Sequence, residues 1–386
     1  MLTFAGLPFK NPYVVASSPL TARVKWLRAA AEAGAAAVST KLTFIKQPFY
    51  GKLRMYDDPA TGSIVCHDRR LDLDEGARLV EEGKRVTGDL IYLCNITHAA
   101  DDLAGWVRLA KTLESAGADL IEANFICPNL SLTAKSLGQA VHTAGAIPGQ
   151  DPAAAKRIVQ ALKAEIAIPI VCKLTPNVTD LVAVALACEE GGADGLCVAG
   201  GQLSLPPMDI YHPERIYPLL EGASMGSLGG PSARLLGFAM VAQLARRCRV
   251  PIIGGGGLET WEHAVQFMMW GATLVTACTT LMWYGWETIG ETLAGMQRFM
   301  QAQGYRGYEE LIGRSLPQFR AAEELRTLVG APAVDEATCI GCGACLKPGH
   351  CDAITLVDGI AQVAPDACLG CGICVALCPV HALSLP

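Results

Sequence analysis

Short apolar segments recur along the first 330 residues and alternate with longer amphipathic segments. Each apolar segment spans five to seven residues, the length of a buried strand. The segments between them are rich in Ala and Leu at helical spacing, as in 103–116 and 153–166. The pattern therefore predicts eight strands, at 12–17, 36–41, 90–95, 119–125, 168–174, 194–199, 250–254 and 272–277.

Eight strands that alternate with helices predict an α/β fold, a (β/α)8 TIM barrel. A doubly wound parallel sheet is the alternative, but eight units at this spacing fit a closed barrel better. We place the barrel in residues 1–325 and a linker in 326–334. Residues 335–386 are then predicted to form a small, ferredoxin-like α+β domain.

The composition indicates an extensively buried, globular chain. Hydrophobic residues make up 51% and charged residues 18%, which excludes a disordered protein. No apolar run reaches the ~18 residues of a membrane span, and the N-terminus does not resemble a secretory signal. The net charge of -6, without a basic run, argues against nucleic acid as a main partner. We expect a soluble, cytoplasmic protein without a membrane partner.

Eight of the 16 cysteines lie in the last 48 residues, in two closely spaced runs. Three thiolates three residues apart can bind three corners of an iron–sulfur cube, and in two-cluster ferredoxins the fourth ligand comes from the other run. Structural zinc is the alternative, but zinc sites use two cysteine pairs rather than two such quartets. We therefore predict two [4Fe–4S] clusters, one on Cys339, Cys342, Cys345 and Cys378, the other on Cys368, Cys371, Cys374 and Cys351.

Polar or small residues follow nearly every predicted strand, where a barrel carries its active site. Glycines at 254–257 and the sequence ACTT at 277–280 follow strands seven and eight and resemble a phosphate cradle. No GxGxxG motif follows the first strand, so a mononucleotide such as FMN fits better than a dinucleotide. The remaining strand ends carry Ala16, Ser17, Lys41, Asn95, Asn124, Cys127, Lys173, Gly200 and Gly201.

Three of these residues have side chains suited to flavin chemistry. Lys41 and Lys173 each end an apolar strand, where a cation can stabilise negative charge on a reduced flavin, although lysines at such positions can also extend to solvent. Cys127 opens the segment after strand four and can supply a proton, although a lone cysteine is more often a core residue. Asn124 and Asn129 flank this thiol and can bind a planar polar substrate.

Nearly the whole chain resembles class 1 dihydroorotate dehydrogenases and the C-terminal half of dihydropyrimidine dehydrogenase. The resemblance rests on sequences such as NPYVVASSPLT, ANFICPN, VCKLTPNVTD, SLGGPSAR and IGGGGLET. It implies that Cys127 is the active-site acid or base, on the substrate face of the flavin. The FMN contacts that it implies are Ala16, Ser17, Lys41, Asn95, Asn124, Lys173, Gly230, Gly255, Gly256, Cys278 and Thr279.

The chain departs from this family around the substrate. It has Ile126 where the family has a serine, and Ala199-Gly200-Gly201 where the family has a polar Asn-Thr or Asn-Ser pair. The early loop at 63–72 contains no asparagine, although the family has one there. Asn124 and Asn129 are thus the remaining substrate-binding asparagines.

We therefore expect an oxidoreductase that uses FMN and iron–sulfur clusters and acts on a C–C bond of a pyrimidine-like substrate. The alternatives are another substrate, either a different cyclic amide or a conjugated acid, and another function, that of a non-catalytic electron-transfer subunit. A reductase of a nucleic-acid base is disfavoured by the acidic net charge. Lacking a dinucleotide motif, the chain is expected to exchange electrons with a separate NAD(P)H-oxidising flavoprotein subunit or a ferredoxin. We expect an oligomer.

Overall fold

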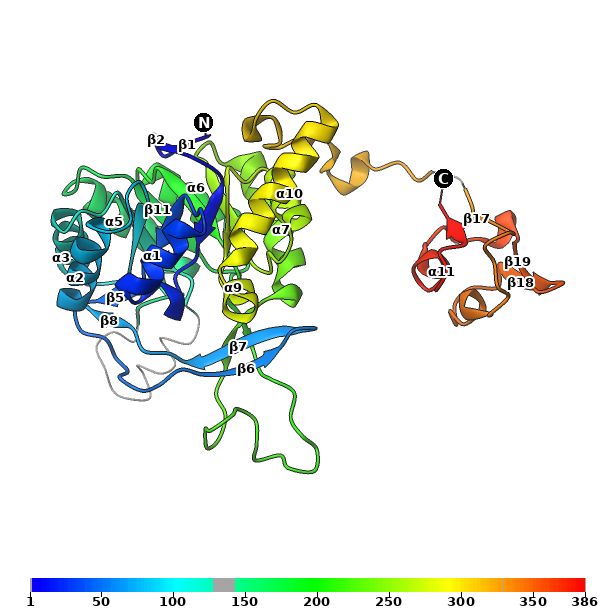
Figure 1. Cartoon of the computed structure of the whole chain (residues 1–386), viewed down its shortest axis with the longest axis horizontal. Helices are drawn as coiled ribbons and strands as arrows, with labels where there is room; N and C mark the ends of the chain where they lie inside the picture. Colours follow the sequence, from blue (N-terminus) through cyan, green and yellow to red (C-terminus); the bar gives the residue numbers. More distant parts are fainter. Residues whose placement is uncertain (1, 128–142, 329, 386) are drawn as a thin grey trace. The chain divides into compact units, whose positions relative to one another are not determined.

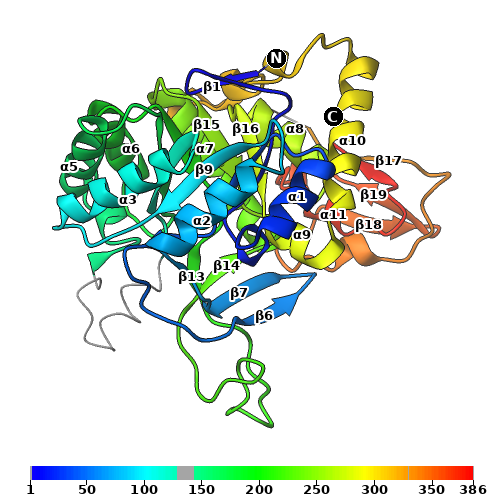
Figure 2. The same ribbon diagram turned by 60° about the vertical axis from the view of Figure 1, so that its left-hand side comes forward.

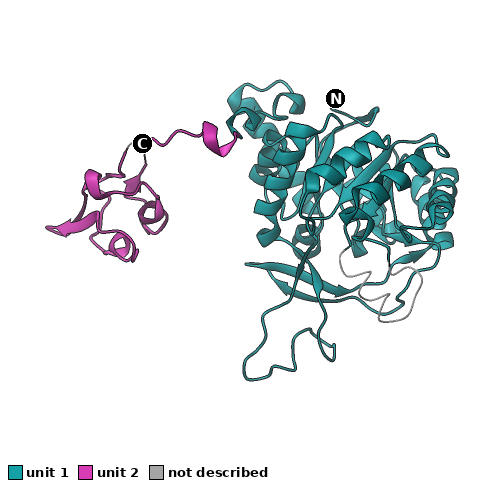
Figure 3. Ribbon diagram, turned by 180° about the vertical axis from the view of Figure 1, so that it is seen from behind, with its two compact units in different colours: residues 1–319 teal, residues 320–386 magenta. Residues whose placement is uncertain are grey.

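The computed structural model describes residues 2–127, 143–328 and 330–385. The chain divides into two compact units, residues 1–319 and 320–386 (Figure 1, Figure 3).

Eight parallel strands of the first unit close into a barrel. Each barrel strand pairs with the next barrel strand along the chain. The last of them, β16 (Leu274–Ala277), pairs with the first, β3 (Tyr13–Val15), through Val275 and Tyr13. The predicted (β/α)8 barrel is confirmed, and the alternative of an open, doubly wound sheet is wrong. The strands are β3 (Tyr13–Val15), β4 (Ala37–Ser39), β9 (Ile91–Ile96), β10 (Leu120–Phe125), β11 (Ile170–Leu174), β12 (Gly195–Val198), β15 (Ile252–Gly255) and β16 (Leu274–Ala277).

Helices cover the outside of the barrel (Figure 2). Capping residues set where several begin: the Asp151 side chain accepts from the backbone N–H groups of Ala153 and Ala154, and Pro152 occupies the first turn. In the described part of the chain, no helix combines the length and the hydrophobicity needed to cross a membrane. The longer helices are α1 (Val24–Glu32), α2 (Leu73–Lys84), α3 (Leu103–Ser115), α5 (Pro152–Lys163), α6 (Leu181–Glu190), α7 (Arg234–Arg247), α8 (Trp261–Met269) and α10 (Glu287–Gln303).

A four-stranded antiparallel sheet lies beside the barrel, next to its short helix α9 (Thr279–Tyr284) (Figure 2). Its order is β13-β14-β7-β6, with β6 at Arg54–Asp58, β7 at Gly62–His67, β13 at Gln202–Ser204 and β14 at Gly226–Gly229. The interpretation of 63–72 as a loop was wrong: β7 occupies its first half, and β8 (Leu71–Asp72) pairs with β5 (Thr43–Phe44). Because β13 follows β12 after three residues, this sheet is joined to the carboxyl ends of the barrel strands.

The second unit is small and mixes helices with short strands. β17 (Ala333–Val334) pairs with β20 (Leu383–Ser384), and β18 (Ile354–Val357) forms a hairpin with β19 (Ile360–Val363). A single turn of helix, α11 (Ile373–Ala376), follows the hairpin. Three cysteines, Cys345, Cys374 and Cys378, are part of its buried core. The predicted α+β character of this region is confirmed.

The core between the barrel and its helices depends on large, fully buried side chains. Trp106 of α3 is fully buried, its ring meets Phe125 edge to face at 5.6 Å, and its Nε1 donates to the Ala99 carbonyl at 3.0 Å. We predict that Trp106→Ala lowers the free energy of unfolding by about 3–5 kcal/mol, because it leaves a cavity and an unpaired carbonyl. Urea denaturation of the purified protein measures this.

The matched control is Tyr284→Ala, since Tyr284 is an aromatic residue with half of its surface exposed. It should change the free energy of unfolding by less than about 0.5 kcal/mol. Equal losses in the two variants would contradict the assignment of Trp106 to the core that stabilises the barrel.

Candidate functional site

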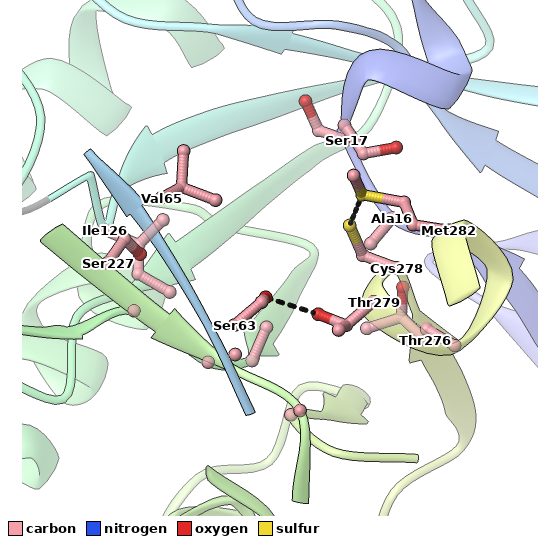
Figure 4. Close-up of a pocket in the computed structure, with 18 of the residues that line it drawn as sticks. Ala16, Ser17, Ser63, Val65, Ile126, Ser227, Thr276, Cys278, Thr279 and Met282 are labelled. Atoms are coloured by element: carbon pink, nitrogen blue, oxygen red, sulfur yellow. Dashed lines mark hydrogen bonds between the residues drawn. The ribbon is translucent and has the colours of Figure 1, made fainter. Parts of the chain in front are cut away.

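A cavity opens at the carboxyl ends of the barrel strands. Its volume is about 1160 Å³ when the solvent at its mouth is included. The barrel strand ends form one side, and the antiparallel sheet contributes Ser63 and Val65 of β7 and Ser227 and Leu228 of β14 (Figure 4). The cavity therefore lies where a barrel enzyme carries its active site.

Most of the residues singled out from the sequence meet in the wall of this cavity. Residues of seven different barrel strand ends converge there although they are far apart in the chain. Asn129 lies outside the described residues. The predicted residues in the wall are Ala16, Ser17, Lys41, Asn124, Cys127, Lys173, Gly200, Gly201, Gly230, Gly256, Cys278 and Thr279.

Two predicted cofactor residues, Asn95 and Gly255, are not among the residues that line the cavity. Asn95 is fully buried, and its side chain bonds to Glu122 and Asn124 instead. A Cβ on Gly255 would lie 2.5 Å from the Thr276 side chain of the neighbouring strand. Asn95 therefore supports a residue of the wall, and Gly255 allows close packing of β15 on β16.

Lys173 forms a buried ion pair below the cavity. Its Nζ lies 3.3 Å from Oε2 of Glu122, and both side chains are more than nine-tenths buried. Burial is the largest single influence and would lower the pKa of Lys173, but Glu122, together with Cys197 and Cys127, outweighs burial, and the pKa lies above the ordinary lysine value. The cation that the sequence predicted at this position is thus held in its charged form.

Lys41 has a different environment on another side of the same cavity. It forms an ion pair with Asp68, which also lies 3.5 Å from the Arg70 guanidinium. Burial lowers the pKa of Lys41, Arg70 lowers it further, and the raising effect of Asp68 does not make up the difference. Asp68 and Arg70 line the cavity, and the sequence analysis missed both of them.

Cys127 is half-buried at the start of the segment that follows β10. Its backbone N–H, like that of Ile126, donates to Oδ1 of Asn124 at 3.2 Å. Its side chain packs against a small apolar cluster of Leu42, Phe44 and Ala144. The thiol therefore belongs to the cavity wall and is not a residue of the barrel core.

Glycines let two backbone segments approach each other in the wall. Gly256 has a φ of +97°, and a Cβ there would lie 2.9 Å from the backbone nitrogen of Gly200. Nearby, Ser63 Oγ and Thr279 Oγ1 are 3.3 Å apart (Figure 4). A wall of backbone and hydroxyl groups, with two lysines and a thiol beside it, fits the flat ring and the phosphate of FMN.

The residues that β7 and β14 add to the wall were also missed. Neither segment is recognisable as a strand from the sequence, because neither is an apolar run of the kind that predicts a parallel barrel strand. In β7 (Gly62–His67) only Val65 and His67 are partly exposed, so the alternation of buried and exposed residues that is typical of a half-buried strand is weak. Val65, Leu228 and Ile126 make this side of the cavity less polar than an asparagine-rich site.

The eight cysteines of the second unit surround two cavities. Cys339, Cys342, Cys345 and Cys378 line one, and Cys351, Cys368, Cys371 and Cys374 line the other. Gly341 and Gly370 have φ values of +65° and +67°, which bend each cysteine loop as expected. No three His, Cys, Asp or Glu side chains of the described residues are placed to bind a single metal ion. The quartets are the ones expected when each run completes the other run's cluster.

Comparison with known proteins agrees with both units. The family model of dihydroorotate dehydrogenase matches residues 1–300, and that of the 4Fe-4S binding domain matches residues 361–384, which favours iron–sulfur over zinc. The NAD-dependent dihydropyrimidine dehydrogenase subunit PreA of Escherichia coli is 27% identical over 355 residues, covering 89% of this chain and 84% of that protein.

Archaeal relatives match the barrel. The catalytic subunit of dihydroorotate dehydrogenase B (NAD(+)) from Pyrococcus furiosus is 30% identical, covering 80% of this chain and 96% of that protein. Its counterpart from Methanothermobacter thermautotrophicus is also 30% identical, covering 81% and 96%. The chain belongs to the dihydroorotate dehydrogenase family, as an FMN- and iron–sulfur-dependent oxidoreductase.

Proposed function

We propose that the cavity at the carboxyl ends of the barrel strands binds FMN and a pyrimidine-like substrate, and that Cys127 is the acid or base of the reaction. The observation that carries this proposal is the meeting of Cys127, Lys41, Lys173 and Asn124 in one wall. In this proposal, residues 1–325 are the FMN-binding catalytic domain, 326–334 a linker and 335–386 the ferredoxin domain.

The residues of the wall divide between cofactor and substrate. The backbone at Gly256 and Thr279 lies where it can bind the phosphate, and Lys173 can stabilise negative charge on the flavin ring. Asn124 and Asn129 would bind the polar edge of the substrate. The other flavin contacts are Ala16, Ser17, Lys41, Gly200, Gly201, Gly230 and Cys278, with Asn95 and Gly255 supporting them from behind.

FMN, when bound, supplies hydride exchange with one carbon of the substrate. Cys127 Sγ gives a proton to the neighbouring carbon when the double bond is reduced and takes that proton back when the bond is oxidised. Lys41 lines the same cavity, so its charge can favour an anionic form of the substrate or of the flavin ring. The same residues serve both directions.

Electrons reach the barrel from a separate partner in this proposal. The two cysteine quartets would hold [4Fe–4S] clusters, which pass single electrons. The relatives from Escherichia coli and Pyrococcus furiosus are both described as subunits of NAD-dependent enzymes. A NAD(P)H-oxidising flavoprotein subunit or a soluble ferredoxin fits this role, within an oligomer.

We predict that Cys127→Ser lowers the rate of turnover of dihydropyrimidine or dihydroorotate by about 100-fold or more, because a hydroxyl is a much weaker acid than a thiol. The bound-flavin spectrum should stay unchanged, since the Asn124 bonds go to the backbone at this position. Steady-state assays with an artificial electron acceptor and absorbance spectra measure the two effects.

Cys248→Ser is the control, because Cys248 is another half-buried barrel cysteine and does not line the cavity. Its turnover should equal that of the unchanged protein. If Cys127→Ser kept full turnover, the proposed role of this thiol would be wrong.

A second prediction concerns the clusters. Cys378→Ala should lower the iron content by about half, because it removes the fourth ligand of one cluster and leaves the other quartet intact. Iron analysis of protein reconstituted without oxygen, with electron paramagnetic resonance of the reduced sample, tests this. Complete loss of iron, or no loss, would contradict the assignment of Cys378 to the Cys339–Cys345 run.

A third prediction concerns pH. Since the pKa of Lys41 lies below the ordinary value of about 10.4, its positive charge is present at low pH and is lost as the pH rises through that lowered pKa. Turnover should therefore fall on the alkaline side. Asp68→Asn removes the group that raises this pKa and should move the fall by roughly one pH unit or more to lower pH.

The measurement is the pH profile of kcat/KM, with Asp58→Asn as the control on the exposed end of β6. The control should leave the profile unchanged. If Asp68→Asn and Asp58→Asn lost activity at the same alkaline pH, Asp68 would not raise the pKa of Lys41, and this prediction would be wrong.

A further inference from the structure

One carboxylate lies inside the barrel beneath the cavity and has no role in the proposed function so far. Glu122 belongs to β10, two residues before Asn124, so the two side chains project from the same face of the strand. It is 1% exposed and contacts residues of β4, β9 and β11. A carboxylate in such a position needs partners for its charge and for its oxygens.

Glu122 has three partners on those strands. Ser39 Oγ and Asn95 Nδ2 both donate to its Oε2, and Lys173 Nζ lies 3.3 Å from the same oxygen. Two of the donors are neutral, so the ion pair with Lys173 supplies the balancing charge. The pairing is mutual, because the Lys173 side chain is also more than nine-tenths buried.

The bond to Asn95 also sets the direction of a chain of hydrogen bonds. An ionised carboxylate only accepts, so Asn95 must turn its amide nitrogen towards Glu122 and its oxygen away. That oxygen accepts from Asn124 Nδ2 at 3.0 Å. Asn124 Oδ1 is then left to accept the backbone N–H groups of Ile126 and Cys127, each at 3.2 Å.

Glu122 is thus connected to both functional sides of the cavity. Through the ion pair it reaches Lys173, on the side assigned to the flavin. Through Asn95 and Asn124 it reaches the backbone at Cys127, on the side assigned to the substrate. Neither connection requires Glu122 to touch the cavity, and it is not among the residues that line it.

We propose that Glu122 is a positioning residue that keeps Lys173 charged and orients the Asn95–Asn124 pair that holds the backbone at Cys127. The proposal rests on the function proposed above for Lys173 and Cys127. It adds one group, beneath the cavity, that organises both.

The charge on Lys173 provides the test. The titratable groups that face Lys173 are Glu122 of β10, Cys197 of β12, Cys127 after β10 and Cys278 after β16. Of these, only Glu122 is a carboxylate. When its charge is removed, burial should lower the pKa of Lys173, because the group that raises this pKa most is gone.

The experiment is a pH titration of the absorbance of bound FMN in the full-length protein. Compared with the unchanged protein, in which Lys41 alone of the two lysines titrates, Glu122→Gln should show one additional spectral transition between about pH 7 and pH 10, as Lys173 loses its proton. Glu122→Asp, which keeps the charge, should lack the transition. Asp89→Asn, which removes the carboxylate of the exposed ion pair with Lys10, is the matched control and should not show this transition.

A double variant assigns the transition and guards against misfolding. Glu122→Gln with Lys173→Met removes both charges, so it should lack the transition and melt at a higher temperature than Glu122→Gln alone. If Glu122→Gln alone is insoluble, a soluble double variant supports the ion pair and an insoluble one contradicts it.

The connection to Cys127 has its own readout. The rate at which iodoacetamide alkylates Cys127, followed by mass spectrometry of its peptide, should change in Glu122→Gln and be restored in Glu122→Asp. Titrations and alkylation rates equal to those of the unchanged protein would overturn the proposal. A protein that binds no FMN at all would instead overturn the proposed function, so the two failures are distinguishable.

Discussion

Closure of the parallel barrel is the constraint on which the rest of the structure depends. The pairing of β16 with β3 brings residues near 275 next to residues near 14 and completes a ring in which every strand has two neighbours. Once the ring is closed, all eight carboxyl ends meet at one face. Lys41, Asn124, Lys173 and Cys278 share a cavity for this reason, although the chain separates them by more than 230 residues (from 41 to 278).

The interior of the barrel has to accommodate charge as well as apolar side chains. Lys173 and Glu122 neutralise each other there, whereas Lys41 is paired at the cavity itself, with Asp68. The two lysines therefore differ in the direction of their pKa shifts although both end a barrel strand. Lys173 is paired with a carboxylate of the neighbouring barrel strand, β10, whereas the partner of Lys41 comes from the segment after β7, outside the barrel.

Much of this architecture follows from local sequence patterns. Strand length, helix spacing and cysteine spacing predict the eight barrel strands and the two cysteine quartets, because each depends on residues close together in the chain. The antiparallel sheet was missed because β7 and β14 are short, rich in Gly and Ser, and pair only across about 160 residues, as in Ser63 with Gly229. Asp68 and Arg70 were missed for a related reason: their contact with Lys41 follows from the course of the chain after β7, which no local pattern specifies.

The cavity wall combines two kinds of surface. On the side of Gly256 and Gly200 the backbones are so close that a single added carbon would collide with its neighbour, which leaves evolution little freedom there. On the side of the antiparallel sheet, Val65 and Leu228 present ordinary side chains to the same cavity. The two sides are linked by the Leu228 backbone carbonyl, which accepts from the Gly201 N–H at 2.8 Å, and exchanging the side chains leaves this backbone link in place. Substitutions at Val65 of β7 and Leu228 of β14 would thus adapt the cavity to substrates with other ring substituents, while the residues proposed to bind the flavin stay the same.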